Sequence, residues 1–278
     1  MRLPNNLEIA VFAYNRPSHL RRVLISLEDY KIKKINLFLD GPKSLKDKIL
    51  QKEIIFMAKF NKYLKVNLIR FNKNKGLAKS ITSGIDNLAR KKKNIIILED
   101  DCVPRKEFFL FILDIIKRQF YKKNTVPICG YQLPEIENAK DRNIYPLFFK
   151  YFIPWGWFVT YKDWNEYRSS KSMAKKDFIK NDKLFSQIKK IIEKKNKKIW
   201  SLKFIEYNLI RKRKIIFPNK SLIKNIGFDG SGVNSSITDK FNSFYTVIKR
   251  INVAKVHQNI ILQKKQLLIL SKRVKYFF

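Results

Sequence analysis

Hydrophobic positions in the first hundred residues alternate between short continuous runs and stretches with helical spacing. Continuous apolar runs bounded by turn residues are typical of buried strands, and here they predict strands at 7–14, 35–39, 66–71 and 95–98. The intervening stretches predict amphipathic helices, the first of them beginning at Pro17. Their apolar sides are expected at Leu20, Val23, Leu24 and Leu27, then at Leu45, Ile49, Phe56 and Phe60, then at Leu77, Ile81, Ile85 and Leu88.

Strands that alternate with helices predict an α/β fold with right-handed crossovers and a mostly parallel central sheet flanked by helices. Ligands of such sheets bind beyond the carboxyl ends of the strands, where the strand order reverses. With a strand order of 3-2-1-4, the ends of the first and fourth strands lie side by side. We divide the chain into a first half with this alternation (1–104), a second half of the same domain (105–240) and a basic amphipathic closing segment (241–278).

The fourth strand ends in three consecutive carboxylates, Glu99, Asp100 and Asp101. Acids this close repel one another unless a countercharge is present, and a divalent metal that bridges to phosphates is the usual solution. The alternative interpretation is a strand followed by a solvated acidic turn.

The ends of the first two strands carry residues that suit a nucleotide diphosphate. Asn15 and Arg16 follow the first strand, and Asp40 follows the second. An arginine fork suits phosphate, and an aspartate can accept a hydrogen bond from a base or ribose. Taken singly, Arg16 could be a solvated residue at a helix entry and Asp40 a turn residue before Gly-Pro. Their common position at strand ends favours the binding site.

The net charge of the chain excludes fewer classes of partner than the three clustered acids do. The 278 residues contain 60 Lys and Arg against 23 Asp and Glu, a net charge of +37. Such a field attracts nucleic acid, an anionic membrane surface or phosphate-bearing substrates, although part of the lysine excess can reflect a biased coding composition. No nucleic-acid recognition module is recognisable, so we expect no specific nucleic-acid partner. No Gly-x-Gly-x-x-Gly follows the first strand and no Walker-type loop is present, which disfavours dinucleotide binding and P-loop chemistry.

Two cysteines, Cys102 and Cys129, have no metal-binding spacing and are expected to be buried free thiols. No signal peptide is visible at the N-terminus and no window of about 18 apolar residues occurs. These features predict cytoplasmic residence, with peripheral attachment to the inner face of the cytoplasmic membrane as an open alternative. The lysine-rich stretch 175–198 and the closing segment are read first as solvated basic faces, and second as surfaces attracted to anionic lipid.

The second half begins with an expected amphipathic helix at 105–120 and a strand at 126–131. The aromatic-rich stretch 151–164 could stack on sugar rings, but we favour a buried core. Gly156 between two tryptophans suggests a close backbone approach, such as a turn that lines a substrate.

Several segments together resemble the nucleotide-sugar half of a GT-A glycosyltransferase. They are FAYNRP at 12–17, FLDGP at 38–42, NKGLAKSI at 74–81 and ILEDDCVP at 97–104, where Glu99 to Asp101 would stand for the DxD-type motif. The closer resemblance is to the group that contains the Golgi N-acetylglucosaminyltransferase of complex N-glycan branching and its bacterial relatives. Further matching segments in the second half are PWGW at 154–157, Trp200, and NIGFDGSG at 225–232. The resemblance therefore covers residues 7–240.

This resemblance implies a GT-A fold, with residues 1–104 as the nucleotide-sugar-binding half and residues 105–240 as the acceptor-side half. It also implies roles for named residues. Asp101 would coordinate Mn²⁺ or Mg²⁺ on the diphosphate, Glu99 would reach the ribose, Asp40 the base and Arg16 the diphosphate. Donor contacts are also expected from Asn15, Lys75, Asp100, Gly232 and Asn234. The last two lie in a glycine-rich loop, 227–234, that could close as a lid, and Asn234 stands where bacterial relatives often carry His.

An inverting transferase needs a carboxylate base for the attacking hydroxyl, and in the resembled group it follows the tryptophan that Trp200 matches. Ser201 occupies that position here. Glu206, Asp163 and Asp229 are the candidate replacements, and a different base or a lost activity stays open.

The sequence therefore predicts a metal-dependent, inverting glycosyltransferase of the hexosyl or N-acetylhexosaminyl type. It would move a sugar from a nucleotide diphosphate, expected to be UDP, to a glycan or lipid-linked acceptor in surface polysaccharide or lipopolysaccharide synthesis. The alternatives are a basic nucleic-acid-binding protein and a catalytically degenerate transferase that serves as a binding subunit.

Overall fold

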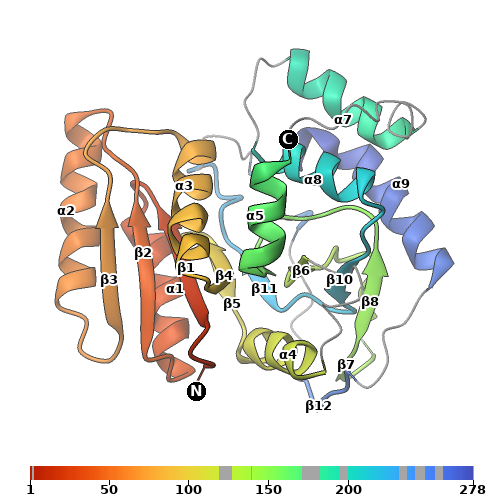
Figure 1. Cartoon of the computed structure of the whole chain (residues 1–278), viewed down its shortest axis with the longest axis horizontal. Helices are drawn as coiled ribbons and strands as arrows, with labels where there is room; N and C mark the ends of the chain where they lie inside the picture. Colours follow the sequence, from red (N-terminus) through yellow and green to blue (C-terminus); the bar gives the residue numbers. More distant parts are fainter. Residues whose placement is uncertain are drawn as a thin grey trace.

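A single eight-stranded sheet forms the centre of the computed structural model, in the order β3-β2-β1-β4-β9-β6-β10-β8 (Figure 1). The structure describes residues 1, 3–118, 127–138, 140–170, 182–194, 200–231, 237–241, 248–253 and 259–277. The strands of the sheet are β1 (Leu7–Ala13), β2 (Lys34–Leu39), β3 (Lys65–Arg70), β4 (Asn94–Glu99), β6 (Ile128–Cys129), β8 (Pro146–Phe149), β9 (Trp157–Val159) and β10 (Ile215–Pro218). Two small ladders pair β5 (Cys102–Pro104) with β11 (Ile223–Asn225), and β7 (Asn143–Ile144) with β12 (Arg250–Ile251).

The helices surround this sheet. They are α1 (Pro17–Asp29), α2 (Leu45–Lys59), α3 (Leu77–Arg90), α4 (Lys106–Lys117), α5 (Tyr161–Ser169), α7 (Lys183–Lys194), α8 (Trp200–Ile210) and α9 (Ile260–Phe277). None of the helices in the described ranges combines the length and the apolar character needed to cross a bilayer. Of the stretch 175–198, only the part from 182 to 194 is described, and it contains α7.

The predicted strand order 3-2-1-4 is confirmed. β1 pairs in parallel with β2 on one side and β4 on the other, so that Phe12 lies opposite Glu99 and Ala13 opposite Leu39. The chain steps outward from β1 to β3 and then returns for β4, so right-handed crossovers place α3 on the opposite face from α1 and α2. Accordingly α1 contacts α2, while α3 contacts β1, β4 and α5. The carboxyl ends of the four strands meet at one edge.

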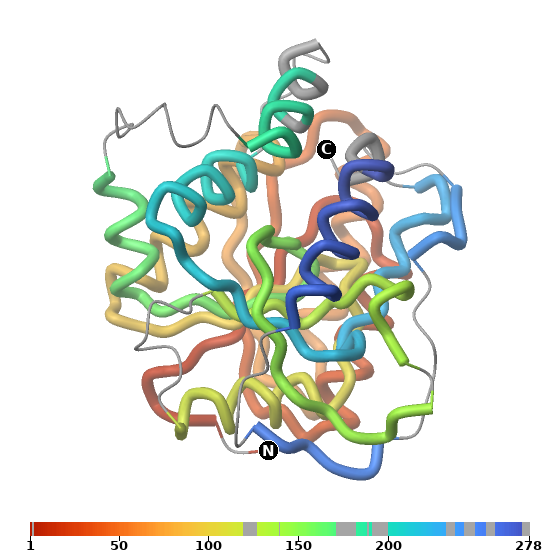
Figure 2. The backbone as a smooth tube through the Cα atoms, turned by 90° about the vertical axis from the view of Figure 1, so that its right-hand side faces the viewer, coloured from red at the N-terminus to blue at the C-terminus, as the bar shows by residue number. Residues whose placement is uncertain are grey.

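The second half of the chain extends the same sheet and introduces the antiparallel strands. β9 runs antiparallel to both β4 and β6, and β8 runs antiparallel to β10. The other strands of the sheet share one direction, so the expected mostly parallel α/β sheet is confirmed. The helix α9 lies across the β8 end of the sheet (Figure 2).

The core is mostly apolar and includes the aromatic-rich stretch. Ile95 to Leu98 of β4 are at most 1% exposed. Trp157 stacks on Trp200 with ring centroids 5.6 Å apart, and the neighbouring Phe158 is fully buried. These contacts confirm the core interpretation of the stretch 151–164. Cys102 and Cys129 are buried free thiols, as predicted, and burial raises the pKa of each.

The helix α2 is rotated by half a turn from the predicted orientation. The sequence analysis expected Leu45, Ile49, Phe56 and Phe60 to face the sheet, and this expectation is wrong because all of them are more than half exposed. The buried residues of the helix are Asp47, Gln51, Ile54 and Ala58.

Polar contacts with the strand ends fix this rotation. Asp47 accepts hydrogen bonds from the Tyr14 hydroxyl and the Asn15 amide, both at 2.7 Å, and closes a capping box with Ser44. One turn later, the Gln51 amide donates to the backbone oxygens of Tyr14 at 3.0 Å and Asp40 at 2.8 Å. Because these buried polar groups lose their partners if the helix turns, they outweigh the apolar pattern.

Replacing the Asp47 carboxylate should destabilise the fold, because the half-buried donors of Tyr14 and Asn15 lose their acceptor together with the helix cap. We expect Asp47→Ala to lower the free energy of unfolding at pH 7 by about 2 kcal/mol, measured by urea denaturation. The exposed Glu53 on the same helix provides the control, and Glu53→Ala should change stability by less than about 0.5 kcal/mol.

The difference between the wild type and Asp47→Ala should also depend on pH. Burial opposes ionisation of Asp47, but the hydrogen bonds from Tyr14, Asn15 and Ser44 prevail and hold its pKa well below the usual value of 3.8. A depressed pKa contributes stability that is complete above the unfolded-state value and declines as pH falls through the folded-state value. The stability difference should therefore be constant from neutral pH to about pH 4 and shrink only below it. A difference that already shrinks between pH 7 and pH 5 would contradict this role.

Candidate functional site

The site is built at the end of β4. Four buried aliphatic residues hold this strand between β1 and β9, and the three carboxylates Glu99, Asp100 and Asp101 follow without a break. Because Phe12 of β1 lies opposite Glu99, the residues that follow β1 reach the same edge. The structure thereby brings Arg16, at the start of α1, to the acids as the strand order predicted.

Arg16 supplies a countercharge to two of the three acids. Its Nη2 donates to Asp100 Oδ1 and, at 2.8 Å, to Asp101 Oδ2. The side chains are largely enclosed, with exposed fractions of 18% for Arg16 and 5% for Asp100. Burial alone would lower the pKa of the guanidinium, but the two carboxylates outweigh it and raise the pKa above its usual value. The pair is therefore a partly buried, charge-assisted bond.

One guanidinium does not neutralise three acids. Burial, together with the charges of Asp101 and Asp100, raises the pKa of Glu99 to about 8. Burial also raises the pKa of Asp100 to about 6, although Arg16 opposes the shift. Burial is the largest cause of both shifts, and the neighbouring carboxylates add to it. A further cation at this edge would favour the charged forms of these acids.

The donor set fits a divalent metal only in the company of other ligands. Over the described residues, no group of three or more His, Cys, Asp and Glu side chains is arranged to hold an ion. A hard cation such as Mg²⁺ or Mn²⁺ is commonly bound by one or two carboxylates together with substrate phosphates and water. Asp101, at the rim of the site with 15% of its side chain exposed, suits that mode.

A loop after β11 forms the opposite wall. The Ile226 amide donates to the backbone oxygen of Asp101 at 2.8 Å. At Gly227, an added Cβ would lie only 2.2 Å from Asp101 Oδ2, so any side chain there would displace the carboxylate. The antiparallel pairing of Asn225 with Cys102 brings this loop beside the acids.

Asp229 in the same loop contacts α1. Its Oδ2 lies 3.1 Å from His19 Nε2, and its Oδ1 accepts from the Ser231 amide and hydroxyl at 3.0 and 2.6 Å. The hydrogen bonds from Ser231 lower the pKa of Asp229, burial opposes this, and His19 reinforces it. About half of the carboxylate side chain remains exposed. His19 lies one turn after Arg16, so the same helix reaches both the acids and the loop.

An aromatic cluster supports this loop from behind. Phe228 packs on Trp155 and Phe241, with ring centroids 5.2 and 4.5 Å apart. Gly156 has a φ of +67°, and an added Cβ would lie 2.5 Å from the side chain of Ile223 in β11. The close backbone approach expected at Gly156 is therefore present, and its partner is a core side chain.

The end of β2 contributes Asp40. Its Oδ1 accepts from the amides of Gly41 and Lys75, both at 2.9 Å, and this ties the loop after β3 to the end of β2. Within the described residues, Asp40 Oδ2 accepts no hydrogen bond and stays available to a ligand. The Lys75 ammonium lies over the Phe71 ring, 3.7 Å from its centroid.

Asn15 reaches this edge but has a partner already, because its amide donates to Asp47. Gly232 and Asn234 lie outside the described residues.

Asp163 and Glu206 lie elsewhere. β9 runs antiparallel to β4, so α5 begins beside the start of β4, where the Tyr161 amide donates to Asn94 Oδ1 at 3.2 Å. Asp163, near the start of α5, accepts from Arg213 at 2.7 Å. Glu206 belongs to α8, whose Phe204 packs on Tyr167 of α5. Asp163 is thus at the opposite edge of the sheet from the acids, and the structure does not bring it to the site.

Sequence reasoning did not single out His19, Asp47 or Gln51. The Ser44 and Asp47 spacing is a capping-box pattern that precedes an apolar run, and His19 follows Arg16 at helical spacing, so both had a local signal. Gln51 had none, because its two backbone partners come from distant strand ends.

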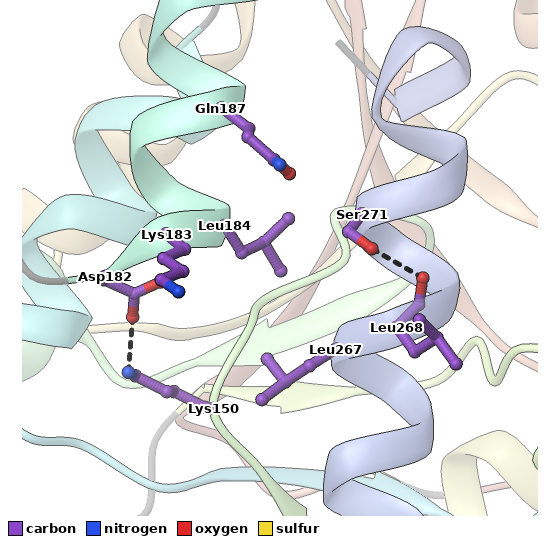
Figure 3. A pocket seen from close by; sticks show the side chains of 8 residues that line it. All are labelled: Lys150, Asp182, Lys183, Leu184, Gln187, Leu267, Leu268 and Ser271. Carbon is purple, nitrogen blue, oxygen red and sulfur yellow. Dashed lines mark hydrogen bonds and ion pairs between the residues drawn. The ribbon is translucent and has the colours of Figure 1, made fainter.

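One hollow on the surface of the described residues is separate from the acidic edge. It measures about 690 Å³ and lies between α7 and α9, where Leu184 and Leu267 project into it and Lys150 pairs with Asp182 (Figure 3). We place the candidate site at the acids in spite of this, because the charged side chains converge there.

No family model matches the chain, and no curated protein matches it. Among solved structures, a mannosyltransferase from Pyrobaculum calidifontis in complex with GDP-Man and Mn²⁺ is similar at 10% identity and a TM-score of 0.39, over 56% of this chain and 44% of that chain. The galactosyltransferase LgtC, in complex with donor and acceptor sugar analogs, is similar at 12% identity and a TM-score of 0.39, over 75% and 72%. A197 from STIV is similar at 11% identity and a TM-score of 0.35, over 78% and 83%. The chain spans less than half of the length of the mannosyltransferase.

Removing the Arg16 guanidinium should leave the buried acids without their countercharge. We expect Arg16→Ala to lower the free energy of unfolding by about 3 kcal/mol, measured by urea denaturation at neutral pH. Arg22 is exposed on the same helix, and Arg22→Ala should change stability by less than about 0.5 kcal/mol. Equal stability of the two variants would show that the acids do not depend on Arg16.

Proposed function

We propose that the chain is a metal-dependent glycosyltransferase that moves a sugar from a nucleotide diphosphate to a hydroxyl acceptor. The convergence of Arg16, the three acids, Asp40 and the loop after β11 on one sheet edge carries this proposal. An edge of this kind offers a cation for phosphate, acids for a metal and an acceptor for a base. The resemblance of the segments around Arg16, Asp40 and Asp101 to a GT-A donor site points to the same reaction.

Arg16 is able to serve the acids and a diphosphate together. It uses Nη2 for both carboxylates, which leaves Nη1 and Nε as donors to phosphate oxygens. Asp40 would bind the base through its unpartnered Oδ2, and Glu99 would accept from the ribose. Lys75, Asn15 and Asp100 would support the donor from its surroundings, and Gly232 and Asn234 from the loop after β11.

Asp101 would hold Mn²⁺ or Mg²⁺ together with the diphosphate oxygens of the donor. The ion would supply charge stabilisation as the nucleoside diphosphate departs. Arg16 donates in the same place, and fixed donors of this kind stabilise developing negative charge because they need no reorganisation.

Asp229 is the candidate base that the geometry favours. Of the three carboxylates considered, it lies in the loop that contacts Asp101, and its exposed side chain can meet an acceptor hydroxyl. The contact with His19 at 3.1 Å fixes its orientation. Ser201 is 3% exposed inside α8 and cannot reach solvent. Direct attack with Asp229 as base would invert the anomeric centre.

The proposed nucleotide, sugar type and acceptor rest on the sequence resemblance alone. It favours a UDP-sugar, a hexosyl or N-acetylhexosaminyl group, and a glycan or lipid-linked acceptor of surface polysaccharide or lipopolysaccharide synthesis at the cytoplasmic side of a membrane. Thermal-shift measurements with UDP-, GDP-, CMP- and TDP-sugars, with and without Mn²⁺, identify the donor.

Loss of the metal ligand should abolish transfer. We expect Asp101→Asn to lower nucleotide-sugar turnover by about a thousandfold or more, measured as release of nucleoside diphosphate with Mn²⁺ present. Asp29 is an exposed acid on α1, and Asp29→Asn should keep full activity. Full turnover by Asp101→Asn, or by the wild type after chelation of all divalent metal, would refute the proposal. Donor binding by the wild type without any turnover would identify a binding subunit instead.

Loss of the base should separate catalysis from binding. We expect Asp229→Asn to lower kcat by about a hundredfold or more while the donor-induced thermal shift is retained, because general-base catalysis contributes about that much. Asp163→Asn is the comparison, since Asp163 lies at the opposite edge and pairs with Arg213. It should keep kcat, and the reverse result would assign the base to Asp163.

A further inference from the structure

The outer face of α2 carries an exposed apolar stripe, formed by Leu45, Ile49, Phe56 and Phe60. Their exposed fractions are 74%, 54%, 63% and 65%. The spacing of four, seven and four residues places all of them on one face of the helix. The Phe56 and Phe60 rings lie 4.7 Å apart, so the stripe is continuous at this end, and Tyr63 continues it with 75% exposure. Figure 1 shows α2 at the outer end of the sheet, beside β3.

Packing within the chain does not account for this stripe. Burial of one such side chain is worth about 1.5–3 kcal/mol, so leaving four of them in water forgoes a large stabilisation. The inner face of the helix is committed to Asp47 and Gln51, whose hydrogen bonds hold the strand ends. The stripe is therefore available to something outside the fold, and contiguous exposed apolar patches commonly mark an interaction site.

Lysines border the stripe. Lys48, Lys52 and Lys59 are exposed on one side of it, Lys46 lies at its beginning and Lys62 beyond its end. Glu53 is the exposed acid of the helix, since Asp47 is turned inward. Aromatic and aliphatic side chains on one face with lysines alongside are the pattern of helices that lie in a membrane interface. Each lysine near an anionic surface adds about 1 kcal/mol of attraction.

We propose that the stripe of α2 docks on an anionic phospholipid bilayer, with its apolar side chains at the boundary between headgroups and acyl chains and its lysines on the lipid phosphates. A second copy of the chain fits this face less well, because docking two stripes would bring lysines against lysines in a protein of net charge +37. The proposal does not rest on glycosyl transfer, because it concerns where the protein sits.

The location of the stripe would place a docked bilayer near the candidate site. The first turn of α2 is bonded to Tyr14 and Asn15, just before Arg16, so the stripe begins at the sheet edge that holds the acids. A bilayer in contact with α2 would therefore lie beside the candidate site, where a lipid-borne substrate would be within reach.

Flotation of the full-length protein with lipid vesicles tests this proposal. The wild type should float with vesicles that contain phosphatidylglycerol, and about tenfold less with phosphatidylcholine alone. The stripe variant should lose about tenfold or more of the binding to anionic vesicles. Its substitutions are Leu45→Ser, Ile49→Ser, Phe56→Ser and Phe60→Ser.

The matched control uses exposed aliphatic residues at the other end of the molecule. These lie on α9, where they are 55–77% exposed and also stand among lysines. The control should bind like the wild type, and loss of binding in it instead of the stripe variant would overturn the proposal. Its substitutions are Ile260→Ser, Ile261→Ser and Leu268→Ser.

Lysine substitutions test whether vesicle binding depends on the lysines beside the stripe or on the overall positive charge of the protein. Removing the lysines that border the stripe should weaken binding to anionic vesicles more than removing the same number from α9, because only the former would lie at the bilayer. Equal effects of the two sets would overturn the proposal. The two sets are Lys48→Gln, Lys52→Gln and Lys59→Gln, against Lys264→Gln, Lys265→Gln and Lys272→Gln.

Circular dichroism reports whether the fourfold variant folds. If it does not, a variant with a single substitution in the stripe provides the test. In Phe56→Trp, the emission of the new tryptophan should shift to the blue on addition of anionic vesicles and be quenched by brominated lipid. Unchanged emission would contradict insertion. Light scattering tests the alternative that a second copy of the chain covers the stripe. A wild-type dimer that is absent in the stripe variant would assign this face to a second copy and overturn the proposal.

Discussion

The ion pair of Arg16 with Asp100 and Asp101 is the constraint on which the rest of the site depends. A strand buried on both faces delivers three acids to one point, and burial penalises the charged forms of Glu99 and Asp100. Arg16 offsets part of this free-energy penalty, and it can reach the acids because β1 lies next to β4 and ends at the same level. The order of the strands is therefore an electrostatic requirement as well as a topological one. The negative charge that remains at this edge would be offset by a bound cation.

The first hundred residues could be predicted well because their signals are local. Buried strands such as 95–98 are continuous apolar runs, and Leu20, Val23 and Leu24 mark the inner face of α1 by spacing alone. Given the alternation of strands and helices, handedness rules leave few topologies. The meeting of Arg16, Asp40 and the acids at one edge follows from that topology.

Features that depend on distant parts of the chain could not be predicted. The rotation of α2 is decided by Gln51, whose partners are backbone oxygens at two strand ends, so the apolar spacing gave the wrong face. The position of Asp163 depends on β9 running against β4, and a three-residue strand carries no sign of its direction. The contact between His19 and Asp229 joins residues that are far apart in sequence, and spacing cannot reveal it.

The closeness of Gly227 to Asp101 makes the position of this carboxylate depend on a single glycine. Asp101 Oδ2 is held between the Arg16 guanidinium and the backbone at Gly227, where there is no room for even a methyl group. The carboxylate is therefore screened on that side, while its Oδ1 accepts a weak hydrogen bond from the Cys102 thiol at 3.5 Å. The absence of a side chain at position 227 is thus a condition for the ion pair, because any larger residue there would push Asp101 Oδ2 away from Arg16.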